Sequence, residues 1–174
     1  MHDHILESLE REGDWVTNRV VYGKIIPGEL GGIETGIRQL IRKRPLEFQK
    51  MQIGDFEPTV PTIEELIRIK SFLIIKRNQM RDYLDFAALS DKTGIAASVK
   101  IINNLDEYYT DDSADTHVNL KPALSQLVCQ LSNPNPKDFK NIGQLPDYKG
   151  TADKWKDWKN IIEICSLVAK GVME

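Results

Sequence analysis

The chain has 174 residues, of which 28% are charged and 41% are hydrophobic, and its formal net charge is −3. These values are typical of a globular protein and exclude a disordered one. The length suits one ordinary hydrophobic core, so we expect a single domain over residues 1–174. The small negative charge gives no overall attraction to nucleic acid or to an anionic membrane.

The sequence predicts a cytoplasmic protein that has no membrane partner. No apolar run approaches the roughly 20 residues that a spanning helix needs, and no charged-then-apolar signal segment opens the chain. Cys129 and Cys165 both lie in apolar helical patterns. This pattern predicts buried, inert thiols, neither paired in a disulfide nor binding a metal.

Residues 1–60 predict a small mixed sheet and a basic helix. Residues 2–12 carry apolar side chains on one side of a short helix. Residues 19–26 are rich in β-branched side chains, and Pro27-Gly28 should end that strand. Residues 46–53 and 56–60 are expected to form a hairpin.

The basic helix is predicted over residues 33–44, where apolar side chains recur at helical spacing. Its polar side and its end carry Arg38, Arg42, Lys43 and Arg44. Two interpretations stay open: these cations complement the helix dipole, or they form a patch that touches RNA or nucleotide phosphate. The nearby glycines, Gly28, Gly31, Gly32 and Gly36, lack the spacing of a phosphate loop and are expected to form a flexible turn.

Residues 61–92 give the clearest pattern in the chain. Thr62 to Glu65 fit a capping box, in which a hydroxyl and a carboxylate each satisfy a free backbone N–H. The apolar residues that follow predict a core helix over residues 62–76. A polar run, 77–79, then interrupts the pattern, which indicates two helices meeting at a bend near Asn78.

Charged side chains collect at this junction, namely Lys70, Arg77, Arg81, Asp82 and Asp85. In one interpretation they are structural, with Asp82 favoured in the first turn of the second helix and Asp85 paired with Arg81. In the other, the cations hold a polyphosphate while a carboxylate orients a reacting group or a metal-bound water.

The same residues resemble a known family. Glu64-Glu65-Leu66 with Lys70, followed by Arg77, Arg81-Asp82-Tyr83, Asp85 and Leu89, resemble the C-terminal motif block of the abortive-infection (AbiEii-type) nucleotidyltransferases, which include toxins of type IV toxin-antitoxin systems. The resemblance runs from about Gly31 to Lys92. It implies a nucleotidyltransferase-like fold, Mg²⁺ and NTP as cofactors, and a nucleotide, RNA, antitoxin or second protein half as partner.

In that family the chemistry is in-line nucleotidyl transfer to a hydroxyl. The resemblance implies phosphate binding by Lys70, Arg77 and Arg81, and orientation of catalytic groups by Asp82 and Asp85. The chain departs from the family in lacking the Gly-Ser turn and Asp-x-Asp pair that bind the metal. It is therefore expected to be a remnant of the fold, to start late, or to work with a separately encoded half.

Because that motif is absent, the sequence leaves open whether the chain is an enzyme. The alternative is a non-catalytic interaction or regulatory protein that binds a protein or RNA through its basic helix or its tryptophan-bearing tail. Residues 150–174 form that tail, and Trp155 and Trp158 are expected to pack into the core on one side of a helix.

Further helices are predicted over residues 95–109 and 122–131, and residues 132–150 should form a surface connection. The acidic stretch 111–117 is expected to be a solvated linker rather than a cation site. Together these elements predict an α+β fold, with a small N-terminal sheet, a helical core over 61–131 and a C-terminal helix.

Overall fold

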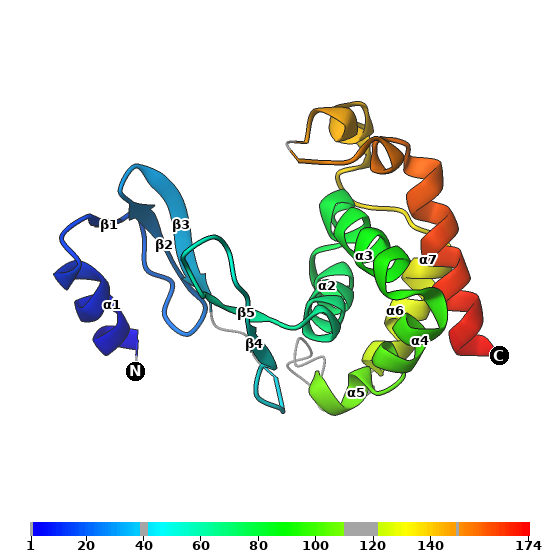
Figure 1. Cartoon of the computed structure of the whole chain (residues 1–174), viewed down its shortest axis with the longest axis horizontal. Helices are drawn as coiled ribbons and strands as arrows, with labels where there is room; N and C mark the ends of the chain where they lie inside the picture. Colours follow the sequence, from blue (N-terminus) through cyan, green and yellow to red (C-terminus); the bar gives the residue numbers. More distant parts are fainter. Residues whose placement is uncertain (1, 39–41, 110–121, 149) are drawn as a thin grey trace. The chain divides into compact units, whose positions relative to one another are not determined.

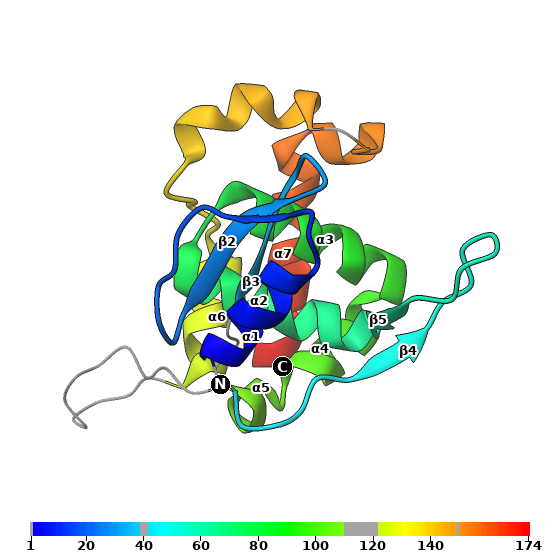
Figure 2. The same ribbon diagram turned by 90° about the vertical axis from the view of Figure 1, so that its left-hand side faces the viewer.

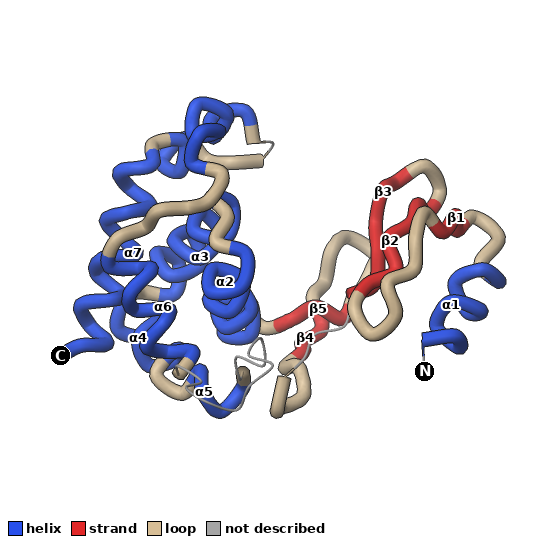
Figure 3. Tube along the Cα trace, turned by 180° about the vertical axis from the view of Figure 1, so that it is seen from behind, coloured by secondary structure: helices blue, strands red, loops and turns tan. Residues whose placement is uncertain are grey.

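The structure is a computed structural model that describes residues 2–38, 42–109, 122–148 and 150–174. It confirms the α+β class, with small antiparallel sheets followed by a largely helical region (Figures 1 and 3). The chain divides into two compact units, Met1–Ile41 and Arg42–Glu174. That they make up a single domain stays a prediction, and each unit is described by itself.

The first unit is one helix and a three-stranded antiparallel sheet. Helix α1 spans His2–Arg11, and strands β1 (Trp15–Thr17), β2 (Ile25–Leu30) and β3 (Ile33–Arg38) pair in the order β1-β2-β3. Gly31 and Gly32 connect β2 to β3 with φ angles of +56° and +81°. A two-residue turn with two positive φ angles matches the right-handed twist of the strands it joins, and glycine adopts it without strain.

Two predictions for this unit are wrong. Residues 33–38 form a strand rather than the start of a helix, because the Gly31-Gly32 turn pairs Ile33 with Leu30 and commits the segment to the ladder. The strand also begins at Ile25 and runs through Pro27-Gly28, which were expected to end it. Gly28 is needed inside this sheet, because a Cβ there would lie 2.4 Å from the Trp15 ring.

The predicted hairpin before the helices is confirmed. Strands β4 (Phe48–Lys50) and β5 (Thr59–Pro61) pair antiparallel, and Ile53 and Phe56 form a bridge nearer the turn. Figure 2 shows this hairpin extending from the helices of its unit. Phe48, Ile53 and Phe56 are exposed.

The helices of the second unit are α2 (Ile63–Arg77), α3 (Met80–Thr93), α4 (Ile95–Ile102), α5 (Leu105–Tyr108), α6 (Ala123–Ser132) and α7 (Trp158–Met173), with 3₁₀ segments η1 (Phe139–Asp147) and η2 (Asp153–Lys156). Helix α7 packs along α3, α4 and α6, and α2 packs on the same three helices (Figure 1). Fully buried side chains fill the space between them, including Ile67, Ile74, Phe86, Leu127 and Ile161. Among the described helices, none has both the length and the apolar character needed to cross a bilayer.

The predicted start of α2 is confirmed, but only half of the capping box forms. The Thr62 hydroxyl accepts a hydrogen bond from the Glu65 N–H at 3.1 Å. The Thr62 N–H donates instead to the Glu47 carbonyl at 3.0 Å. The Glu65 carboxylate takes no part in the cap and contacts arginine side chains instead.

Towards the C-terminus the predicted helices form with shifted bounds. The helix expected over 95–109 is divided into α4 and α5, and the last helix is divided into η2 and α7. Trp158 is buried against Tyr83 as expected, whereas Trp155 is only half-buried. Cys165 is buried and burial raises the pKa of its thiol, but Cys129 is exposed, contrary to the prediction. The acidic stretch 111–117 lies outside the described residues.

Candidate functional site

Asn78 holds the bend between α2 and α3. It ends α2 in the left-handed conformation (φ 51°), which Asn tolerates better than most residues. Its side-chain oxygen accepts a hydrogen bond from the Tyr83 hydroxyl at 2.6 Å, and its amide nitrogen donates to the Asn135 carbonyl at 3.0 Å. The predicted bend is therefore confirmed. Its hydrogen bonds hold the backbone from which the neighbouring charged side chains extend.

Arg77 and Asp82 form an ion pair across this bend. Arg77 Nη2 lies 2.6 Å from Asp82 Oδ1 and Arg77 Nε lies 3.2 Å from Oδ2, a two-point contact. The Asp82 side chain is 1% exposed, whereas that of Arg77 is 37% exposed. Asp82 thus stands in the first turn of α3, as expected, and its carboxylate is occupied by a neighbour in the fold.

Lys70 and Asp85 form a second, separate pair, with Lys70 Nζ 2.6 Å from Asp85 Oδ2. The prediction that Asp85 pairs with Arg81 is wrong, because Lys70 reaches it from the facing helix α2. Arg81 is exposed and has no ion pair among the described residues. The geometry at the junction is thus that of a helix pair linked by ion pairs, with one cation left over.

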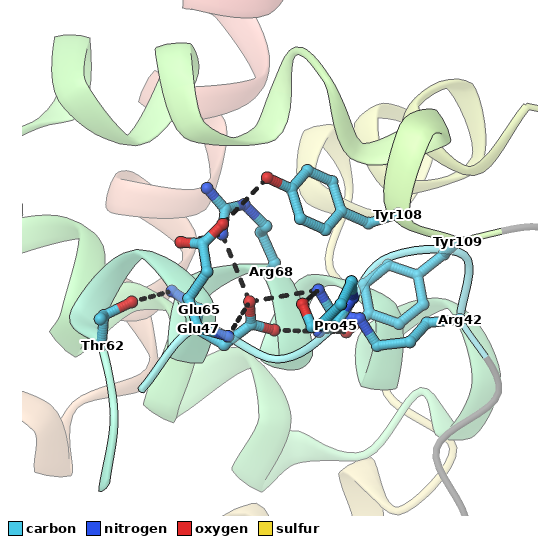
Figure 4. A network of polar contacts seen from close by, with 8 residues as sticks. All are labelled: Arg42, Pro45, Glu47, Thr62, Glu65, Arg68, Tyr108 and Tyr109. Carbon is cyan, nitrogen blue, oxygen red and sulfur yellow. Dashed lines mark hydrogen bonds and ion pairs between the residues drawn. The ribbon is translucent and has the colours of Figure 1, made fainter. Parts of the chain in front are cut away.

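A larger charged network, which the sequence did not reveal, lies where α2 meets the segment 42–47 and α5 (Figure 4). Its centre is Glu65, whose side chain is 0% exposed. The carboxylate contacts the Arg42 guanidinium through both oxygens and lies 3.3 Å from Arg68 Nη1. It also accepts a hydrogen bond from the Glu47 N–H at 3.4 Å. One buried acid therefore faces two buried arginines.

Tyrosine rings and a second acid complete this network, hereafter the Glu65 network (Figure 4). Glu47 Oε2 lies 2.8 Å from Arg68 Nη1, and its Oε1 accepts a hydrogen bond from the Tyr108 hydroxyl at 3.0 Å. The Arg68 guanidinium stands 4.3 Å from the centre of the Tyr108 ring. Such stacking favours the cation where water is scarce. Tyr109 accepts a hydrogen bond from Arg42 at 3.3 Å and stacks on Phe72, with ring centres 4.2 Å apart.

The pKa shifts in the network follow from these contacts. The hydrogen bond from Arg68 is the main cause of the lowered pKa of Glu47. Burial raises the pKa of Tyr109 to about 12. The Nε atoms of Arg42 and Arg68 are buried without a partner among the described residues. Burying a guanidinium with an unpartnered N–H costs free energy unless its other contacts are strong. The burial of both arginines is therefore stabilised mainly by their contacts with Glu65.

The basic stretch predicted to meet RNA or phosphate is largely used within the fold. Arg42 is 5% exposed in the Glu65 network. Lys43 Nζ donates to the Asp106 carbonyl at 3.1 Å, and Arg44 pairs with Glu107. These residues do not end a helix, so the interpretation that they complement a helix dipole is wrong. The alternative, a patch that touches RNA or nucleotide phosphate, stays a prediction.

A cleft of about 830 Å³ runs along α3 in the same unit. Its residues come from α3 and, beyond η1, from residues 148 and 150–155: Arg81, Leu84, Asp85, Ala88, Asp91, Lys92, Tyr148, Gly150, Thr151, Ala152 and Trp155. The α3 members recur every three or four residues, which puts them on one side of the helix. Of the predicted site residues, Arg81 and Asp85 line this cleft, whereas Lys70, Arg77 and Asp82 do not.

The α3 cleft has an ion pair at its rim. Lys154 Nζ lies 2.6 Å from Asp91 Oδ2, joining η2 to α3, and stands 4.8 Å from the centre of the Trp155 ring. A stripe of charged and apolar residues along α3 is the sequence signal for this cleft. No sequence pattern predicts the approach of Trp155, which was expected to pack into the core.

The described residues do not form a site that fits the expected Mg²⁺ and NTP. Within the described residues, no group of three or more His, Cys, Asp or Glu side chains is placed to share a metal ion. Asp82 and Asp85, the carboxylates that would serve, already pair with Arg77 and Lys70. The geometry does not fit the group, and binding of Mg²⁺ or NTP stays an untested prediction.

Known proteins that are similar to this chain bear transport names. The chain is 30% identical over 153 residues to "Heme uptake protein MmpL11" of Mycobacterium tuberculosis, which is 84% of this chain and 14% of that protein. It is 29% identical over 136 residues to "Mycolic acid-containing lipids exporter MmpL11" of Mycolicibacterium smegmatis, covering 76% of this chain and 13% of the relative. The chain is similar to a small part of large transport proteins. No family model matches it, and no solved structure is significantly similar.

These findings overturn the resemblance to AbiEii-type nucleotidyltransferases. The matching proteins bear transport names, and neither a toxin-antitoxin role nor a nucleotidyltransferase role is supported. Residues Lys70, Arg77, Arg81, Asp82 and Asp85 were given phosphate-binding and catalytic roles through that resemblance. Those roles lose their support, because a pattern of charges at helical spacing is also what structural ion pairs require.

Proposed function

We propose that this chain is a binding or regulatory module of a membrane transport system, comparable to one segment of the MmpL11 proteins. The observation that carries the proposal is the similarity of 84% of the chain to those proteins at 30% identity. The chain spans only 14% of that relative's length, so transport itself would belong to the assembly rather than to this chain.

The geometry of the helical unit suits binding better than chemistry. The carboxylates at the α2–α3 junction are neutralised by partners in the fold, and the Glu65 network fixes the segment 42–47 on α2. What stays accessible is the α3 cleft and the exposed hairpin β4–β5. A rigid body with an accessible cleft is what a recognition module requires.

We also propose a cytoplasmic location for this module. Both cysteines are free thiols, and one of them, Cys129, is exposed. Exposed free thiols persist in the reducing cytosol and are oxidised or paired in most compartments outside it. An RNA or a second protein as partner stays a prediction that no contact described above tests.

The proposal is tested by exchanging the segment within the Mycolicibacterium smegmatis relative. In a strain lacking that exporter, its matched segment is replaced by this chain, and export of mycolic acid-containing lipids is measured by thin-layer chromatography. We expect the exchanged protein to restore export, at least in part. A version with a flexible linker in place of the segment is the control and should not export. An exchanged protein that reaches normal levels yet exports no more than the linker version would refute the proposal.

A further inference from the structure

The charges of the α3 cleft are not all used within the fold. Its carboxylates are neutralised, since Asp85 pairs with Lys70 and Asp91 pairs with Lys154. Arg81 and Lys92 also line the cleft, and both are exposed with no ion pair among the described residues. The local potential is therefore positive, although the whole chain carries a net charge of −3. A cleft of this sign attracts an anion.

The surface between these two cations combines the paired carboxylates of Asp85 and Asp91 with apolar and aromatic side chains. Leu84 and Ala88 lie between Arg81 and Lys92 on the same side of α3. With a helix rise of 1.5 Å per residue, the Cα atoms of the two residues lie about 16 Å apart along the helix axis. Tyr148 and Trp155, both half-buried, supply rings from the other stretch of chain. Such a surface gains free energy by covering an apolar body.

We propose that the α3 cleft binds an organic anion with an apolar body. Its acidic group pairs with Arg81 or Lys92, and its body covers Ala88 with the small exposed part of Leu84 and contacts the rings of Tyr148 and Trp155. The volume of about 830 Å³ lies in the range of small-molecule sites, roughly 300–1,000 Å³. A fatty carboxylate and a flat porphyrin with carboxylate side chains share this chemistry.

This inference goes beyond the proposed function and rests on the cleft alone. A failed segment exchange would not contradict anion binding by the cleft. A cleft that binds no anion would not contradict a role in transport. The two proposals therefore fail separately.

The test is titration of the purified full-length chain with three probes, followed by calorimetry and by amide chemical shifts. Dodecanoate presents a carboxylate on an elongated chain, and 1-dodecanol presents the same chain without the charge. Deuteroporphyrin IX presents carboxylates on a flat ring. We expect saturable binding of at least one of the two anions, with shifts at α3 and at residues 148 and 150–155, and binding of 1-dodecanol at least tenfold weaker than that of dodecanoate.

Two variants tie the binding to the cleft. Arg81→Gln with Lys92→Gln removes both cations and should weaken anion binding about tenfold or more, because a charged hydrogen bond is lost. The matched control, Lys24→Gln with Lys100→Gln, makes the same charge change at exposed lysines that do not line the cleft and should change affinity less than twofold. Ala88→Trp fills the cleft without changing charge and should abolish binding.

The outcomes separate cleanly. Tighter binding of dodecanoate would indicate a ligand with an elongated body, and tighter binding of the porphyrin would indicate a flat one. Either result supports the proposal if the double variant weakens the binding. Equal binding of dodecanoate and 1-dodecanol, equal loss in the control variant, or no binding of either anion by a well-folded chain would overturn it.

Discussion

The Glu65 network and the α3 cleft are both charged regions of the same helical unit, but they use charge in opposite ways. In the network the charged groups face one another: Glu65 contacts Arg42 and Arg68, and Glu47 closes the set. Arg81 and Lys92 line the cleft, are exposed, and have no ion pair among the described residues. A cluster of charges therefore marks a candidate site only where the fold leaves part of it unpaired.

The stability of the Glu65 network depends most on Glu65 itself. Glu65→Ala leaves two buried arginines without their central partner, so we expect a loss of about 3–5 kcal/mol in the free energy of unfolding. Urea unfolding followed by circular dichroism measures it. Glu64→Ala is the matched control, because Glu64 is the adjacent exposed acid of the same turn and should cost less than about 1 kcal/mol. Similar values for both variants would show that Glu65 is not the centre of the network.

Asp82 and Asp85 form ion pairs of different burial at the α2–α3 junction. Asp82→Asn removes a buried charge that Arg77 contacts twice, so we expect a loss of about 1–3 kcal/mol in the free energy of unfolding. Asp85→Asn should cost under about 1 kcal/mol, because its pair with Lys70 is partly exposed. Thermal unfolding of both variants checks the order. If Asp85→Asn were the more damaging, the junction would not be organised around the Arg77–Asp82 pair.

Glu47 should make the stability of the chain depend weakly on pH. Its pKa in the folded chain is lowered from 4.5, so its contribution is fully present above pH 4.5 and is lost as the pH falls through the lower folded value. The side chain is 43% exposed, so screening should hold the contribution below about 1 kcal/mol.

Glu47→Gln should therefore lower stability at pH 7 and make no difference in strong acid. Urea unfolding of both chains from pH 7 to pH 3 measures the gap. A gap that widens towards acid would mean that Arg68 does not stabilise the ionised form of Glu47.

The sequence predicted those features that local chemistry controls. Thr62 and Asn78 mark the two ends of α2, because a hydroxyl that caps an N–H and a residue that tolerates positive φ act on their own neighbours. Residues 33–38 were misassigned because Ile33 and Ile37 fit either a helix side or one face of a strand. The Gly31-Gly32 turn before them makes the segment a strand, because it folds the chain back against β2.

The Glu65 network could not be predicted, because its members are far apart in the chain. Arg42 and Glu65 are 23 residues apart, and Glu47 and Tyr108 are 61 apart. No periodic pattern links such positions, and Glu65 also satisfied a local pattern, the capping box, that gave it a different role. The resemblance to a nucleotidyltransferase failed for a related reason: its residues are those any ion-paired helix junction needs.

The two thiols differ in exposure, which allows one of them to be modified selectively. Cys165 is buried on α7 with a raised pKa, while Cys129 on α6 faces solvent. Maleimide reagents attack exposed thiolates, so one dye or one surface anchor would attach at a single, known place on the natural chain. The chain can thus be labelled or immobilised without any substitution, leaving the network and the α3 cleft unaltered.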